Sequence, residues 1–409
     1  MNTVSRVIRN TGFLYMKMGV TMFVSLYATR LVLNALGVDD FGIFNMVAGV
    51  IAMLAFLNAS MAAATQRFMS YAEGEGDPEK QKIVFNISVV LHLAIAVMVG
   101  ILLYAAAPIL FGHVLNIPED RVVAARCVYW AMIASTVFGI LGVPCEAMLN
   151  AHENMLYFAI IGVLESFLKL GAALLVVHVP ADKLILYGVL MAGISILAMT
   201  AMLVYCRRNY AECVIAPRRY WKRGVFREMG SFAGWNFTVS ASSMLSEYGV
   251  GIVLNHFFGV ALNAAQAVAQ QINGQTMAFS GTMLKALNPV ISKSEGAGNR
   301  GLMLRASLSG CKFAYLLMAV FAIPLILEAP GLLGLWLHSV PAWAVLFCRL
   351  QLARTLLEQL FLSLGSAIYA EGNIRLYTLV KTGSGILFLG ATWGFYRMGW
   401  PPCMMYVAA

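Results

Sequence analysis

Long apolar segments separated by short polar ones run through the whole sequence. A bilayer-spanning helix needs about 20 apolar residues. In the first half, segments of that length occupy 11–36, 41–66, 83–112, 122–149, 155–179 and 184–206. In the second half they occupy 228–258, 261–288, 302–327, 341–370 and 374–397, and a twelfth begins at Trp400 and reaches Ala409 well short of a span. The pattern predicts an all-α polytopic membrane protein of about 12 helices, the last truncated.

Motifs of the first half return in the second. The pattern S-x-x-E-G-x-G-[D/N] occurs at 70–77 and again at 292–299, an offset of 222 from residue 70 to residue 292. Gly37-Val38 matches Gly259-Val260 at the same offset, and Ala151-His152-Glu153-Asn154 returns as Ala370-Glu371-Gly372-Asn373. Such repeats are typical of transporters. We therefore expect an N-terminal lobe of six helices at 1–207, a basic cytoplasmic linker at 208–226, and a C-terminal lobe at 227–409 that is incomplete at its end.

Composition excludes an ordinary soluble domain. The chain is 60% hydrophobic and 11% charged, whereas a globular protein is about 25% charged. The seven cysteines form no C-x-x-C pair, so we expect neither a disulfide framework nor a metal site. No motif indicates a cofactor.

The net charge of +9 is carried largely by short polar segments. Seven arginines and lysines lie in or next to the linker, and others fall on the same side of the membrane if every segment crosses once. Because positive residues accumulate in cytoplasmic loops, this distribution predicts a cytoplasmic N-terminus and linker. The basic linker suits contact with anionic lipid headgroups, a better explanation of the charge than nucleic-acid binding.

The repeated G-x-G loops have two interpretations. A phosphate-binding loop would follow a strand and precede a Lys-Ser/Thr pair, and neither is present. A tight turn needs glycine for a positive φ and an Asp or Asn to cap the next helix. We favour the turn.

Charged residues inside the expected spans need an explanation, because they are costly at bilayer depth. Two pairs at i,i+4 spacing neutralise themselves: Glu165 with Lys169, and Arg354 with Glu358. Arg30 lies near the outer end of its helix, within reach of Asp39 or Asp40. Lys17 and Lys285 either extend to the nearer interface or face a cavity.

Polar faces on two consecutive segments of the second half point to a water-lined cavity. Asn236, Ser240, Ser243 and Glu247 recur at helical spacing. Gln266, Gln270 and Asn273, continued by Ser280 and Asn288, form a second stripe. Such faces either join helices or line water, and two long ones favour water. With Lys17, Arg30 and Lys285 as bases and Glu247 as the acid, the expected cavity suits an anionic passenger.

Several segments resemble one known family. The stretch from Asn10-Thr11 to Asn45, with its L-G-x-x-[D/E]-[F/Y]-G-[I/L]-[F/Y] pattern, resembles bacterial polysaccharide (O-antigen type) flippases of the multidrug/oligosaccharidyl-lipid/polysaccharide exporter superfamily. So do Ala64-Thr65-Gln66-Arg67-Phe68 and Ala151-His152-Glu153-Asn154-Met155. The resemblance implies two pseudo-symmetric six-helix lobes around a central cavity, alternating access, and transfer of undecaprenyl-pyrophosphate-linked oligosaccharide to the periplasmic leaflet for lipopolysaccharide synthesis.

Two other functions stay open at this point. A multidrug or cation antiporter of the same superfamily would trade H⁺ or Na⁺ against a cationic drug, and needs carboxylates on the cavity helices, where Glu247 is the one candidate. An intramembrane enzyme acting on sugar chains would need a catalytic group such as Ser/His/Asp, and the histidines are scattered. The internal repeat favours a transporter over an enzyme.

Overall fold

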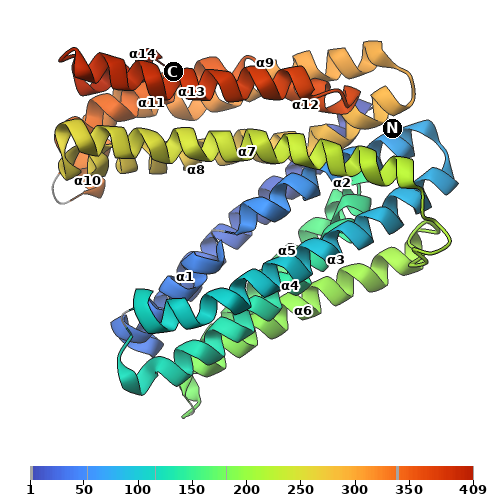
Figure 1. Cartoon of the computed structure of the whole chain (residues 1–409), viewed down its shortest axis with the longest axis horizontal. Helices are drawn as coiled ribbons and strands as arrows, with labels where there is room; N and C mark the ends of the chain where they lie inside the picture. Colours follow the sequence, from blue (N-terminus) through green and yellow to red (C-terminus); the bar gives the residue numbers. More distant parts are fainter. Residues whose placement is uncertain (1–2, 53, 116, 181, 338–339, 409) are drawn as a thin grey trace. The chain divides into compact units, whose positions relative to one another are not determined.

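The computed structural model describes residues 3–52, 54–115, 117–180, 182–337 and 340–408, and these form helices and connecting loops without a strand (Figure 1). The chain divides into two units, Met1–Ser231 and Phe232–Ala409. The division falls inside α7, near its start.

The first unit contains six long helices. Their bounds are α1 Thr3–Ala52, α2 Ala55–Glu75, α3 Pro78–Ile109, α4 Val122–Ala151, α5 Met155–His178 and α6 Lys183–Asn209. A π-helical turn at Leu110–Val114 and a 3-10 turn at Glu119–Arg121 lie between α3 and α4. Helices α1 and α5 pack along each other, as do α4 and α6, α3 and α4, and α2 and α4. Part of the core lies where α3 meets α4, and there the buried Tyr129 hydroxyl donates to the Leu103 carbonyl.

The second unit also consists of helices, and several of those after α9 are short. Their bounds are α7 Arg223–Phe258, α8 Val260–Gly296, α9 Arg300–Leu327, α10 Ala329–Trp336, α11 Ala344–Gln359, α12 Leu362–Glu371, α13 Arg375–Arg397 and α14 Met405–Ala408, with a 3-10 turn at Pro402–Met404. Helix α8 packs against α9, α11 and α12.

Matching residues of the two units share unusual backbone conformations. Gly37 has φ 79° and ψ 175°, and Gly259 has φ 80° and ψ −179°. Both interrupt a helical path, and Gly37 divides α1 into two helices that follow each other directly. Gly76 and Gly298 have φ 71° and 70°. The offset of 222 residues therefore relates equivalent turns, and the repeat is structural.

The turns after these glycines also match. Asp77 caps α3 by accepting from the Glu79 and Lys80 amides, and Asn299 caps α9 by accepting from the Leu302 amide. The G-x-G loops are therefore tight turns with helix caps, as expected.

Seven of the described helices are long and apolar enough to cross a membrane: 5–37, 78–112, 119–151, 155–178, 183–209, 223–258 and 300–327. Many of their large apolar side chains are exposed, as in a multi-pass membrane protein. The span expected at 341–370 is broken: α11 ends at Gln359 and α12 begins at Leu362. Segment 41–66 is also broken, by a turn before α2.

Candidate functional site

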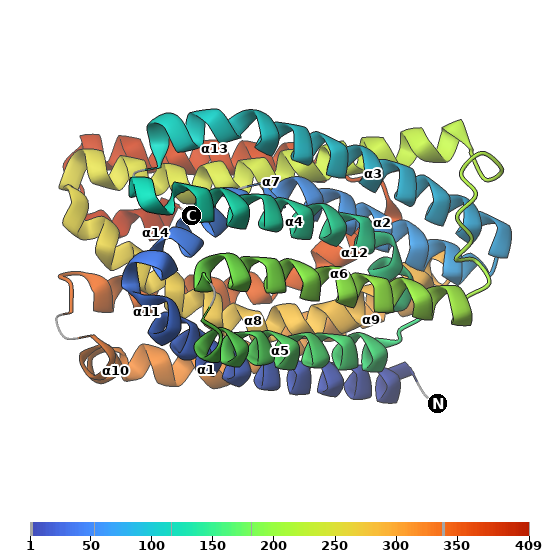
Figure 2. The ribbon, with the colours of Figure 1, turned by 90° about the horizontal axis from the view of Figure 1, so that it is seen from below.

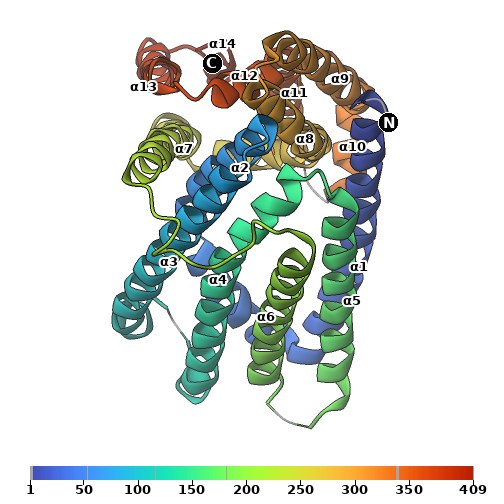
Figure 3. The same ribbon diagram turned by 90° about the vertical axis from the view of Figure 1, so that its right-hand side faces the viewer.

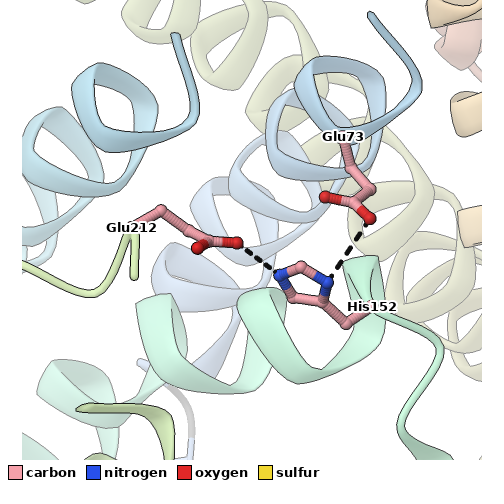
Figure 4. Close-up of side chains that lie close together, drawn as sticks. All are labelled: Glu73, His152 and Glu212. Atoms are coloured by element: carbon pink, nitrogen blue, oxygen red, sulfur yellow. Dashed lines mark hydrogen bonds and ion pairs between the residues drawn. The ribbon is translucent and has the colours of Figure 1, made fainter. Parts of the chain in front are cut away.

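The turn that joins α4 to α5, His152–Asn154, is the centre of a polar cluster in the first unit. His152 lies between two carboxylates that come from different elements (Figure 4). Its Nε2 is 2.6 Å from Glu212 Oε1, and its Nδ1 is 3.4 Å from Glu73 Oε1. The ring also stacks on Tyr210, 4.2 Å between centroids. We call Glu73, His152 and Glu212 the Glu–His–Glu cluster.

The two carboxylates hold His152 in its charged form. Burial lowers the pKa of His152, but the hydrogen bonds to Glu212 and Glu73 outweigh burial and raise it to about 9. The hydrogen bond with His152 in turn lowers the pKa of Glu212. At neutral pH the cluster therefore contains an imidazolium between two carboxylates.

These three side chains are also a set of donors that a metal ion could use, since one ligand atom from each lies within 4.8 Å of the others. Both ring nitrogens, however, face carboxylate oxygens at contact distance. A metal ion would have to displace the ring proton and one of these contacts. The observed contacts fit a proton-bridged cluster, and the second carboxylate oxygen of Glu73 accepts from the Gln81 amide at 2.7 Å.

The other two residues of the turn connect it to neighbouring helices. Glu153 has a φ of 55°, and its side chain pairs with Arg6 of α1 at 3.2 Å. Asn10 of α1 donates to the Glu153 carbonyl. Asn154 caps α5 and donates to the hydroxyls of Tyr205 and Tyr210. The turn therefore connects α1, α2, α5 and α6 with the linker.

The linker that follows α6 is held at a second point on the same unit. Asn86 of α3 donates to the Val214 carbonyl at 2.8 Å and accepts from the Ala216 amide at 2.7 Å. Figure 3 shows the linker passing the ends of α4 and α3 before α7 begins. Glu212 and Asn86 thus fix the linker on both sides of Cys213.

The corresponding turn of the second unit has a different charge pattern. Glu371 occupies the position of His152 in the repeat, and it pairs with Arg300 at 2.9 Å. Gly372, with φ 96°, corresponds to Glu153. The cation of the second unit is therefore an arginine, which stays charged at all accessible pH values. In the first unit the titratable His152 stands where the second unit has the acid Glu371.

Lys17, the first of the cavity candidates, lies against α5. Its ammonium is 3.8 Å from the centre of the Phe158 ring, and its side chain covers Gly162 so closely that a Cβ there would collide with it. Lys17 is partly buried. A glycine on α5 thus makes room for the lysine.

Arg30 is exposed on the same helix. We expected it to extend toward Asp39 or Asp40, but Asp40 pairs with Arg121, which also reaches Asp182 at 2.9 Å. The fold brings Arg121 to Asp40 from 81 residues away in sequence. The two i,i+4 pairs are confirmed, at 2.7 Å for Glu165–Lys169 and 2.9 Å for Arg354–Glu358.

The polar stripe of α7 changes character along its length. Asn236 is buried and accepts a hydrogen bond from the Tyr369 hydroxyl at 2.7 Å. Ser240 donates back to the Asn236 carbonyl. Ser243 and Glu247 are exposed. The stripe is therefore exposed at Ser243 and Glu247 but not at Asn236.

The stripe of α8 lies largely inside the second unit. Gln266, Asn273 and Ser280 are buried, with exposed fractions of 8%, 8% and 0%, whereas Gln270 and Lys285 are partly buried. Asn273 donates to the Met277 sulfur. Of the two roles that a polar face can have in a membrane, the buried members of this stripe fit contact between helices better than the lining of a water-filled cavity.

Sequence reasoning missed the Glu–His–Glu cluster. Glu73 and His152 each lie in a repeated motif, but the first motif was assigned to a turn and the second was used only as evidence of repetition. Glu212 lies in the linker, where its neighbours are mostly basic. The one available signal for a role of Glu73 was that the same residue type recurs at the matching position, Glu295.

Comparison with known proteins identifies the family. The family described as polysaccharide biosynthesis protein matches residues 7–295. A search of curated proteins gives no match.

Solved structures share the fold at low sequence identity. A MATE protein in its straight conformation matches with a TM-score of 0.82 and 14% identity, covering 98% of this chain and 91% of that one. A MOP superfamily transporter from Pyrococcus furiosus matches with a TM-score of 0.81 and 14% identity, over 98% and 91%. A mutant of the Vibrio cholerae MATE transporter VcmN gives 0.78 and 17%, over 99% and 92%. The chain belongs to the polysaccharide biosynthesis protein family and has the pseudo-symmetric helical fold of MOP superfamily transporters.

Proposed function

We propose that the protein is a lipid-linked oligosaccharide flippase. It would move undecaprenyl-pyrophosphate-linked glycan from the cytoplasmic to the periplasmic leaflet by alternating access, as part of O-antigen or related polysaccharide synthesis. The family match over residues 7–295 is the observation that carries this proposal. Transport, rather than catalysis, is the activity that the internal repeat favours.

The charges of the candidate residues support an anionic passenger. Lys17, Arg30 and Lys285 are cations on α1 and α8, and Glu247 is the acid on α7. A pyrophosphate forms its strongest hydrogen bonds with charged donors. Lysine is a flexible point charge, which suits a passenger that must be released. Lys17 would be the first contact, moving off Phe158 to meet the pyrophosphate.

The proposal includes an orientation. The N-terminus and the linker at 208–226 would lie in the cytoplasm, because the basic residues gather there. The chain would sit in the inner membrane, with lobes at 1–207 and 227–409. The Glu–His–Glu cluster would then lie at the cytoplasmic surface, and a gradient of H⁺ or Na⁺ could drive the cycle through Glu247.

A second candidate is a multidrug or cation antiporter. The likeness to MATE structures is a likeness of fold, and it suits this candidate as well as it suits the flippase. Such a protein would bind a cation and would depend on Glu247. The excess of bases over acids among the candidates argues for the flippase.

Complementation separates the two functions. The gene would be expressed in a bacterial strain that lacks its O-antigen flippase, and in a second strain that lacks its main drug efflux pumps. The flippase predicts restored surface glycan and unchanged drug sensitivity. Unchanged glycan together with restored resistance to a cationic drug such as ethidium would instead establish the antiporter.

A further inference from the structure

A groove runs along the outer side of α6 in the first unit, beside the start of α5. It has a volume of about 850 Å³ and is open along one side. Figures 2 and 3 both show α5 and α6 next to each other, and the two helices are in contact. All the lining residues lie on α6 except Tyr157, which belongs to the first turn of α5.

The groove is long and apolar over most of its length. Its wall extends from Gly193 to Arg208, about 22 Å at 1.5 Å per helical residue. One leaflet of the hydrocarbon core is about 15 Å thick, so the groove can receive an acyl chain and still reach the headgroup level. Leu197 and Val204 are 58% and 44% exposed along it. Gly193 leaves open space at the far end, because a Cβ there would meet nothing within 4 Å.

Polar groups gather at the other end. Arg208 and Asn209 lie in the last turn of α6 and are exposed, at the end of a candidate span. Tyr157 and Tyr205 stack with centroids 3.5 Å apart and form the floor there. The Tyr205 hydroxyl accepts from Asn154, which leaves its own proton to be donated.

The charge at this end has one sign. No carboxylate among the described residues pairs with Arg208. The acid nearest in sequence, Glu212, is held by His152. A phosphate would therefore find a guanidinium and a hydroxyl, whereas the ammonium of an amine headgroup would meet the like charge of Arg208. The basic linker that follows adds positive potential near the same end of α6, which attracts anionic lipid.

We infer that this groove binds an anionic phospholipid whose headgroup carries no amine, with its phosphate on Arg208 and one acyl chain along α6 toward Gly193. The bound lipid would connect the end of α6 with the start of α5, beside the turn that holds the linker. This inference concerns the surrounding membrane and does not depend on the passenger.

The test measures lipid binding to the purified full chain by native mass spectrometry, with phosphatidylglycerol, phosphatidylethanolamine and phosphatidylcholine as probes. Arg208→Gln removes the charge, and Gly193→Leu fills the far end. Arg207→Gln is the control for charge, since Arg207 is exposed in the same turn but does not line the groove. Gly171→Leu is the control for bulk, because Gly171 is exposed on α5 and also faces open space.

We expect phosphatidylglycerol to bind the unaltered chain and both controls at least tenfold more tightly than the two zwitterionic lipids. Arg208→Gln should weaken that binding about tenfold, the effect of losing a charge-assisted hydrogen bond, and Gly193→Leu should weaken it for all lipids. Equal binding to Arg208→Gln and Arg207→Gln would overturn the inference. So would equal retention of all three lipids, which would mean non-specific solvation by the membrane.

Discussion

Replacing His152 by glutamine should release the linker in a pH-dependent way. The substitution removes the cation between Glu73 and Glu212 and leaves two carboxylates facing a neutral amide. The pKa of His152 rises from its ordinary 6.5 to about 9 in the fold. At 1.36 kcal/mol per pH unit, this shift corresponds to about 3 kcal/mol of stabilisation as an upper value. Solvent reaches 22% of the His152 side chain and screens part of it.

The sign of the pH dependence follows from the direction of that shift. A group whose pKa is higher in the folded state contributes its full stabilisation below its unfolded pKa, here 6.5. The contribution falls as pH rises and is lost once pH passes about 9. The unaltered chain should therefore hold its linker firmly at pH 6.5 and weakly at pH 10, whereas His152→Gln should hold it weakly at both.

Limited trypsin digestion measures this directly, because the linker contains Arg218, Arg219 and Lys222. Cleavage of a transiently open segment follows its opening equilibrium. Since about 1.4 kcal/mol is tenfold, the linker of His152→Gln should be cut about 10 to 100 times faster than that of the unaltered chain at pH 6.5. At pH 10 the two rates should approach each other.

His178→Gln is the control, since His178 is exposed at the end of α5 and contacts the Leu174 carbonyl of its own helix. It should be cut at the rate of the unaltered chain at every pH. If His152→Gln were cut no faster than His178→Gln at pH 6.5, or if their ratio were the same at pH 10, the cluster would not be what holds the linker.

Three further predictions concern single residues. Asp77→Ala and Asn299→Ala should each destabilise the protein by about 1 kcal/mol, because each removes a helix cap; unchanged melting temperatures would contradict the caps. Gly162→Ala should displace Lys17 from Phe158 and lower transport as much as Lys17→Ala does, and full transport by Gly162→Ala, with Gly171→Ala as control, would show that the position of Lys17 is not used. Glu247→Gln should remove the dependence of transport on an ion gradient, and an unchanged dependence would leave Glu247 no part in coupling.

The sequence predicted most of the helices because hydropathy over 20 residues is a local property. The sequence also carries a signal for the turns at Gly37 and Gly259, since only glycine adopts their conformation easily and the two glycines recur at one offset. The sequence carries no such signal for the break between α11 and α12, because Leu360 and Phe361 are as apolar as the helices on either side.

The polar sites were less predictable because they depend on tertiary contacts. Glu73 and His152 lie 79 positions apart, and Glu212 lies 60 beyond His152. Periodicity placed Gln266, Asn273 and Ser280 on one face of α8, but only the packing against α9, α11 and α12 shows which neighbours that face has. Spacing along one helix defines a face and leaves its surroundings open.

The most direct test of the proposed function is transport in inverted membrane vesicles from a strain that lacks its O-antigen flippase. The vesicles would contain undecaprenyl-pyrophosphate-linked oligosaccharide on their outer, cytoplasmic leaflet, and an enzyme added outside would release glycan that has not moved. With the unaltered chain, and with Lys222→Ala as a control from the exposed linker, we predict that glycan becomes protected with time. Lys17→Ala should slow protection at least tenfold at equal protein level. Protection no faster than in vesicles without the protein would contradict the flippase.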